Sequence, residues 1–129
     1  MKKLKTLALV ILSCMTFASC GGSEKKASSY KQISAEAAME LMEKEEGYVI
    51  LDVRTQEEYD EKHIPGAILI PNETIGTEEI SELPDKEQMI LVYCRSGNRS
   101  KQAAEKLVKL GYTNVIEFGG IKDWTGEVE

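Results

Sequence analysis

The sequence predicts an α/β fold, a mostly parallel sheet of four to five strands with helices on both faces. Short runs that are almost continuously apolar alternate along the chain with segments of helical periodicity. Continuous apolar runs are typical of strands that are covered on both faces. The 129 residues are 42% hydrophobic and 29% charged, which suits one soluble domain with a short additional segment.

The first 29 residues are predicted to lie outside this domain, which we place at residues 30–129. Three lysines, a long apolar run and small residues lead to Cys20, as in a secretory signal. The F-A-S-C ending resembles a bacterial lipobox. We therefore expect a lipoprotein signal peptide at residues 1–19, a lipidated Cys20, and a flexible tether at residues 20–29. This predicts a cell-envelope protein with a lipid anchor in a bacterial membrane; a plain secretory signal is the alternative.

Charge and cysteine content narrow the possible functions further. The formal net charge is −6, which argues against nucleic acid as a partner. The chain has three cysteines. If Cys14 is removed with the signal peptide and Cys20 is acylated, Cys94 has no partner for an internal disulfide. A lone thiol in an oxidising compartment points to chemistry and away from a structural role.

Five segments are expected to form strands. They are a short edge strand at 30–33 and apolar runs at 48–53, 67–70, 89–93 and 115–118. Ligands of parallel sheets bind beyond the carboxyl ends of the strands, and Cys94 lies at such an end.

Four segments are expected to be helical. The first follows the N-cap Ser34 and stops at Gly47, and the second starts with a capping box of Thr55 and Glu58 and runs to about residue 62. Residues 78–83 are expected to form one or two helical turns. The last helix spans residues 100–110 and is closed by a glycine. A final turn is expected to start at Gly119-Gly120 and to hold Trp124.

The loop between the strand at 89–93 and the helix at 100–110 carries the predicted chemistry. The amino end of that helix favours an anion, because its backbone N–H groups are unpaired and its dipole is positive. Arg95 and Arg99 add fixed positive charge. This field should favour a thiolate at Cys94 and lower its pKa from the usual value of about 8.5. A buried structural cysteine is the alternative.

Three motifs resemble the rhodanese family. The segment from Leu51 to Pro71 resembles the signature D-V-R-x-x-x-E-[YF]-x-x-x-H-I-P-G-A. The loop C-R-S-G-N-R-S is similar to the active-site loop of single-domain thiosulfate sulfurtransferases. Gly119-Gly120 with Trp124 matches the closing G-G-x-x-x-W, so the resemblance covers roughly residues 33–128.

The resemblance implies a sulfurtransferase that uses a persulfide on Cys94. The thiolate would take a sulfur from a small anionic donor such as thiosulfate and pass it to a thiol or cyanide-like acceptor. The covalent persulfide would be the only intermediate carrier, with no other cofactor and no metal. The loop N–H groups would form an anion-binding nest, and the two loop arginines would hold the anionic donor. The expected substrate-binding residues are Arg95, Ser96, Gly97, Asn98, Arg99 and Ser100.

Two further residues are expected to support the loop. Asp52 and Arg54 match the D-x-R of the family. We expect Asp52 to orient the loop by a hydrogen bond and Arg54 to pair with Glu57 or Glu58. The only histidine, His63, is expected to be structural.

The loop residues argue against three other functions. Phosphatases on this fold need Cys-x5-Arg, whereas Arg99 is the fifth residue after Cys94 and the required position holds Ser100. An interaction module would not need the cysteine and the two loop arginines. An envelope redox protein would need a resolving cysteine from another protein. Finally, Arg95 directly after the cysteine favours thiosulfate or polysulfide as donor over mercaptopyruvate.

Overall fold

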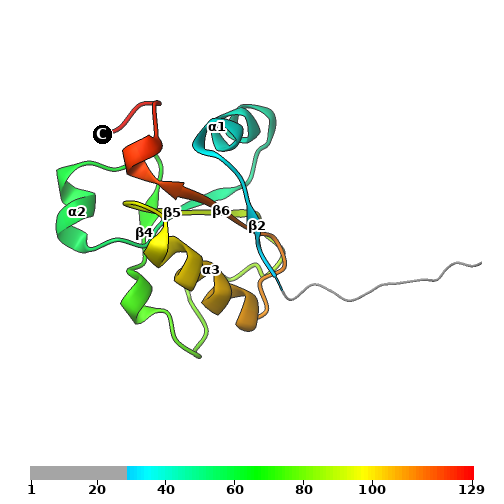
Figure 1. Cartoon of the computed structure of the whole chain (residues 1–129). Coiled ribbons are helices and arrows are strands. Elements are labelled where there is room, and N and C mark those ends of the chain that lie inside the picture. The colour runs from blue at the N-terminus through cyan, green and yellow to red at the C-terminus, as the bar shows by residue number, and fades with distance from the viewer. Residues whose placement is uncertain (1–28) are drawn as a thin grey trace, which may run out of the picture.

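A parallel five-stranded sheet forms the centre of residues 29–129, the part of the chain that the computed structural model describes (Figure 1). The strand order is β2-β6-β5-β3-β4, and every pairing is parallel, which confirms the predicted fold class. The strands are β2 (Lys31–Gln32), β3 (Val49–Asp52), β4 (Ile68–Leu69), β5 (Ile90–Cys94) and β6 (Val115–Gly120). The predicted signal peptide and Cys20 lie outside the described residues.

Helices cover both faces of this sheet, as predicted (Figure 1). Helix α1 (Ala35–Lys44) lies on one face and α3 (Asn98–Lys109) on the other, while the short α2 (Gln56–Glu61) lies beside the β4 edge. Two 3-10 turns, η3 (Asn72–Thr74) and η4 (Ile121–Asp123), complete the domain. Among residues 29–129, no helix is long and apolar enough to span a membrane.

Local sequence explains where the first two helices begin. The Ser34 side chain accepts the Ala37 N–H at 3.0 Å and caps α1. Thr55 and Glu58 form the predicted capping box of α2, in which each side chain accepts the backbone N–H of the other residue. Both starts were predictable because an N-cap acts over only three residues.

Two apolar clusters lie on opposite faces of the sheet, and β5 contributes to both. One contains Val92 and Cys94 and packs under α3. The other contains Leu91 and Tyr93 and packs under α1. All five residues of β5 are buried, because this strand is central and covered on both sides. The loop at residues 95–97, which joins β5 to α3, thus leaves from a strand that is buried along its whole length.

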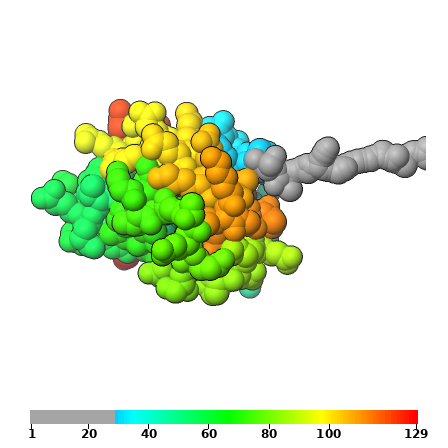
Figure 2. Space-filling model, turned by 90° about the horizontal axis from the view of Figure 1, so that it is seen from below, coloured from blue at the N-terminus to red at the C-terminus, as the bar shows by residue number. Residues whose placement is uncertain are grey.

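The structure corrects three predicted boundaries. Residues 78–83 form bends and a turn and no helix; six residues with acidic side chains at positions 78 and 82 are too short and too repulsive to nucleate one. This segment instead lies beside α3; in Figure 2 it is green to yellow-green and α3 is yellow to orange. Helix α3 begins at Asn98, two residues before the predicted start. The predicted final turn is present, but it starts at Ile121: Gly119-Gly120 end strand β6, and η4 follows with Gly120 as its N-cap and Trp124 as its C-cap.

Candidate active site

Cys94 is the last residue of β5, and its side chain is buried beneath the loop that leads into α3. The residue is only 1% exposed. Its Sγ accepts the Gly97 N–H at 3.0 Å and lies 3.4 Å from the Ser100 Oγ. Within residues 29–129 it is a free cysteine. The loop therefore curls around the sulfur and directs backbone N–H groups toward it.

These hydrogen bonds decide the ionisation of the thiol. Burial alone raises the pKa of Cys94, because it penalises the charged form. Hydrogen bonding with the Ser100 side chain and with the backbone N–H groups of Ser100, Gly97 and Ser96 lowers it, and the resulting pKa of Cys94 lies below the ordinary value. Such a thiol is a better nucleophile at neutral pH than an ordinary cysteine. The predicted lowering of the Cys94 pKa thus comes mainly from hydrogen bonds of the loop and not from the charges of the two arginines.

Two glycines allow this tight loop to form. Gly97 precedes α3 with φ of 112°, a left-handed conformation that residues with a Cβ rarely adopt. At Gly120, a Cβ would overlap the backbone carbonyl of Arg95, so the end of β6 can touch the loop only because this residue lacks a side chain. The Lys122 N–H also donates to the Arg95 carbonyl at 3.2 Å. The G-G motif of the sequence therefore supports the loop directly.

Three of the predicted loop residues are exposed. They are Arg95, Ser96 and Asn98. Arg95 lines a cleft of about 580 Å³ together with Lys62, Lys122, Trp124, Ile121, Glu61, Glu58 and Arg54. In the described part of the chain, no ion pair joins the side chain of Arg95, Lys62 or Lys122. This cleft beside the loop therefore carries positive charge that is free to meet an anion.

Arg99 occupies a different environment from Arg95. Its two terminal nitrogens donate to the two Glu58 carboxylate oxygens at 2.9 and 3.1 Å. The hydrogen bond from Arg99 is the largest cause that lowers the pKa of Glu58, to about 2. Because Glu58 also caps α2, this pair ties the start of α3 to the start of α2 across 41 residues of sequence.

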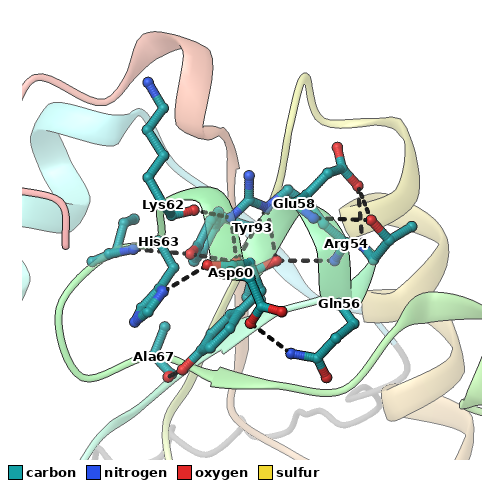
Figure 3. A network of polar contacts seen from close by, with 12 residues as sticks. Arg54, Gln56, Glu58, Asp60, Lys62, His63, Ala67 and Tyr93 are labelled. Atoms are coloured by element: carbon teal, nitrogen blue, oxygen red, sulfur yellow. Dashed lines mark hydrogen bonds and ion pairs between the residues drawn. The ribbon is translucent and has the colours of Figure 1, made fainter.

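Asp52 and Arg54 form a buried pair behind the loop. The Arg54 Nε and terminal nitrogen donate to the Asp52 carboxylate at 2.9 and 2.7 Å, and the Tyr93 hydroxyl donates to it at 2.7 Å. Arg54 also donates to the Lys62 carbonyl at 2.7 Å, and Figure 3 labels Arg54, Tyr93 and Lys62 within this network. Asp52 is completely buried and Arg54 is 4% exposed.

This geometry corrects two predictions. Arg54 pairs with Asp52, not with Glu57 or Glu58, because a two-residue spacing on the buried strand end lets one side chain fold back onto the other. The hydrogen bonds of Asp52 go to Arg54 and Tyr93, and it makes none to the reactive loop. The pair therefore joins β3 and β5 to the turn before β4.

His63 lies on the far side of the same network. Its ring, which Figure 3 labels, stacks on Tyr59 with centroids 3.8 Å apart, and its Nδ1 lies 2.9 Å from the Tyr59 carbonyl. Its backbone pairs with Glu129 in both directions. These contacts place His63 in a structural position that ties the chain end to α2. Within residues 29–129, no group of three or more His, Cys, Asp or Glu side chains could hold a metal ion.

Sequence reasoning missed one buried acidic residue at this site. Glu117, on β6, is 2% exposed and lies against Ser100, its Oε2 accepting the Ser100 hydroxyl at 2.5 Å. The signal was present, since Glu117 is a charged residue inside an apolar strand. Its proximity to the loop depends on the pairing of β5 with β6. In that pairing the register shifts between Val92 and Cys94.

Comparison with known proteins agrees with this geometry. The sequence model of the Rhodanese-like domain family matches residues 34–127. Thiosulfate sulfurtransferase GlpE of Coxiella burnetii is 42% identical over 96 residues, which cover 74% of this chain and 87% of the relative. Thiosulfate sulfurtransferase PspE of Escherichia coli is 42% identical over 73 residues, 57% of this chain and 70% of the relative. YrkF of Bacillus subtilis, provisionally named a sulfur carrier protein, is 40% identical over 110 residues, and the chain spans only 57% of its length.

Solved structures give the same family relationship. A rhodanese with anions from E. coli aligns with a TM-score of 0.59 at 40% identity, covering 64% of this chain and 96% of that one. The solution structure of a rhodanese-like domain from an Anabaena protein aligns with a TM-score of 0.68 at 31% identity, covering 76% and 77%. The similarity thus extends to sequence as well as to fold.

Proposed function

The chain belongs to the Rhodanese-like domain family, and on that premise we propose that it is a sulfurtransferase that carries sulfur as a persulfide on Cys94. The observation that carries the proposal is the Cys94 sulfur, which accepts the Gly97 N–H at 3.0 Å inside a loop that lowers the thiol pKa. A thiolate held by hydrogen-bond donors can attack sulfur without a separate general base.

The proposed reaction has two displacement steps. The Cys94 thiolate attacks the outer sulfur of thiosulfate, forms a new S–S bond, and releases sulfite with the electron pair of the broken bond. A thiol or cyanide acceptor then attacks the outer persulfide sulfur, and the electron pair of the broken S–S bond returns to Cys94. Loop N–H groups keep Cys94 ionised before the first step. In the second step they stabilise the negative charge that returns to its sulfur.

We propose Arg95 as the main side chain that attracts the donor. It is exposed, follows the nucleophile directly, and lines the cleft with Lys62 and Lys122. Arg99 contributes differently, because both of its terminal nitrogens are bonded to Glu58. Arg99 therefore holds the start of α3 through Glu58. It could bind the donor only if its contact with Glu58 were broken.

Intact-mass spectrometry after exposure to thiosulfate tests the proposal. The domain should become heavier by one sulfur atom at Cys94, and cyanide should remove it as thiocyanate. Cys94→Ser should lose both steps and stay folded, because the hydroxyl is close to the thiol in size. If reduced wild-type protein never gains the sulfur but hydrolyses an aryl phosphate, the proposal is wrong. If it does neither, an interaction module takes its place.

A lipid anchor in the cell envelope is a separate proposal that rests on sequence alone. The lipobox-like F-A-S-C ending at Cys20 supports it. Acyl chains contribute about 0.8 kcal/mol per buried methylene, so several chains anchor stably. Cys20→Ala should abolish lipid labelling and membrane partition in a bacterial host. Unchanged labelling would refute the assignment of Cys20.

A further inference from the structure

Glu117 is a buried carboxylate beside the reactive loop, and the reaction proposed above does not use it. Its Oε2 accepts the Ser100 hydroxyl at 2.5 Å and the Gly119 N–H at 2.9 Å, and its Oε1 lies 3.4 Å from the Gln32 side-chain nitrogen. Within residues 29–129, no ion pair involves it. Burying a carboxylate without a cation costs free energy, so its position needs a physical reason.

The Ser100 hydroxyl has one proton and several neighbours that could accept it. The distances from its Oγ are 2.5 Å to Glu117, 3.0 Å to the Gly97 carbonyl, 3.3 Å to the Gly119 carbonyl and 3.4 Å to the Cys94 sulfur. The contact with Glu117 has the length of a charge-assisted O–H···O⁻ bond. The proton is therefore directed at Glu117, and a lone pair of Ser100 is left to face the Cys94 thiol.

We propose that Glu117 is a positioning residue that restrains Cys94, by drawing away the Ser100 proton that would otherwise stabilise the thiolate. Glu117 would thereby regulate the sulfur-transfer site proposed above, a role that rests on that function. Two effects act in the same direction. The carboxylate competes for the only hydroxyl proton, and its negative charge opposes a second negative charge on the nearby sulfur.

The other charged and titratable groups around this site do not act on the Ser100 hydroxyl as Glu117 does. Arg99, at the start of α3, is held by Glu58, and the charge of Cys94 is a minor cause of its raised pKa. Tyr30, at the edge of the sheet, has a raised pKa to which burial contributes most, followed by the charges of Glu105 and Glu117. Of the acidic residues between positions 29 and 129, only Glu117 contacts the hydroxyl that touches the thiol.

Alkylation of Cys94 by iodoacetamide as a function of pH tests the inference. Glu117→Gln keeps the size of the side chain and removes its charge, so the amide accepts the Ser100 proton more weakly. The apparent pKa of Cys94 should fall by about half a unit to one unit. Below the wild-type pKa, alkylation should then be about three- to tenfold faster than in the wild type.

The matched control is Glu105→Gln on α3, which removes an exposed charge that makes no contact with the loop. It should leave the alkylation profile unchanged. An unchanged profile in E117Q would mean that Glu117 is only structural, and a raised pKa would mean that it accepts the thiol proton. Either result overturns the proposal.

Two further variants make the test independent of folding and of the proposed function. Glu117→Ala also removes the carboxylate and should shift the profile in the same direction, so a misfolded E117Q would not end the test. In Ser100→Ala, the effect of E117Q should shrink, because the hydroxyl that links the two groups is gone. Alkylation does not require sulfur transfer, so a wild type that takes no sulfur from thiosulfate would refute the proposed function and leave this comparison intact.

Discussion

Tyr93 and Cys94 are neighbours on β5, but their side chains lie on opposite faces of the sheet and join different polar networks. In the network of Tyr93 the donors match the acceptors, whereas in the network of Cys94 the acceptors exceed the donors. The Tyr93 hydroxyl donates to Asp52 and accepts the Ile64 N–H, and Asp52 is paired with Arg54. On the other face, the Ser100 hydroxyl touches both Glu117 and the Cys94 sulfur but gives its one proton to Glu117, and no ion pair joins Glu117 within the described residues.

The difference separates two uses of buried polar groups. A network whose donors and acceptors are matched holds one arrangement, and removing either Asp52 or Arg54 leaves a buried charge unpaired. In a network with fewer hydrogen-bond donors than acceptors, a group that becomes negative must compete with the other acceptors for the same donor. The pKa of that group then depends on its neighbours. We therefore expect mutations in the Tyr93 network to change stability and mutations around Cys94 to change reactivity.

Breaking the matched network should have the largest effect. Asp52→Ala leaves the Arg54 guanidinium buried without its carboxylate, which should lower the free energy of unfolding by about 3–5 kcal/mol. Urea unfolding measures this change. Glu57→Ala, an exposed carboxylate on α2, should change it by less than about 0.5 kcal/mol. Equal effects of the two substitutions would show that the buried pair does not stabilise the domain.

Adding one methyl group where the end of β6 meets the loop should have the next largest effect. In Gly120→Ala the new Cβ overlaps the Arg95 carbonyl, so the loop must shift at a cost of about 1–3 kcal/mol. Urea unfolding should show the loss, and Cys94 alkylation should change as the N–H groups move. Gly76→Ala, where a Cβ meets nothing within 4 Å, is the control. An unchanged alkylation profile in G120A would mean that this contact does not position the loop.

Removing the exposed loop charge should change donor binding without changing stability. Arg95→Ala should raise the thiosulfate KM about tenfold, because one charge-assisted hydrogen bond is worth about 1.5 kcal/mol at the low end. Steady-state kinetics with cyanide as acceptor measures this. Lys44→Ala, the same loss of charge at the end of α1, should leave KM unchanged. Equal KM values in R95A and wild type would remove Arg95 from the donor site.

The Arg99–Glu58 pair should give the smallest effect, visible only in acid. The pKa of Glu58 is lowered from 4.5 to about 2 in the folded protein. The stabilisation is thus fully present above the unfolded pKa and is lost as the pH falls from about 4.5 to 2. Because the two side chains are 27% and 25% exposed, we expect about 1 kcal/mol.

Unfolding curves of Arg99→Ala between pH 2 and 6 measure this contribution. The variant should lose the stability at the upper end of that range and approach the wild type at pH 2. Lys101→Ala, an exposed neighbour on α3, should follow the wild-type curve. A difference between R99A and wild type that does not depend on pH would show that packing, and not the charge of Glu58, is what Arg99 contributes.

The sequence by itself determined the features that act over a few residues. The apolar runs predicted the four main strands, and the caps at Ser34 and Thr55 predicted where α1 and α2 begin. The cysteine between a strand and a helix predicted the reactive loop, because chain direction alone puts that cysteine near a helix amino end.

Only the tertiary structure decided which side chains meet across the domain. Arg99 bonds to Glu58 over a separation of 41 residues, and Ser100 bonds to Glu117 over 17. Both contacts depend on the order of strands in the sheet, and the second also depends on the register shift between β5 and β6. Periodicity and caps describe a segment and its immediate neighbours. The partner of a buried charge is set by strand pairing, which brings together residues that are distant in the sequence.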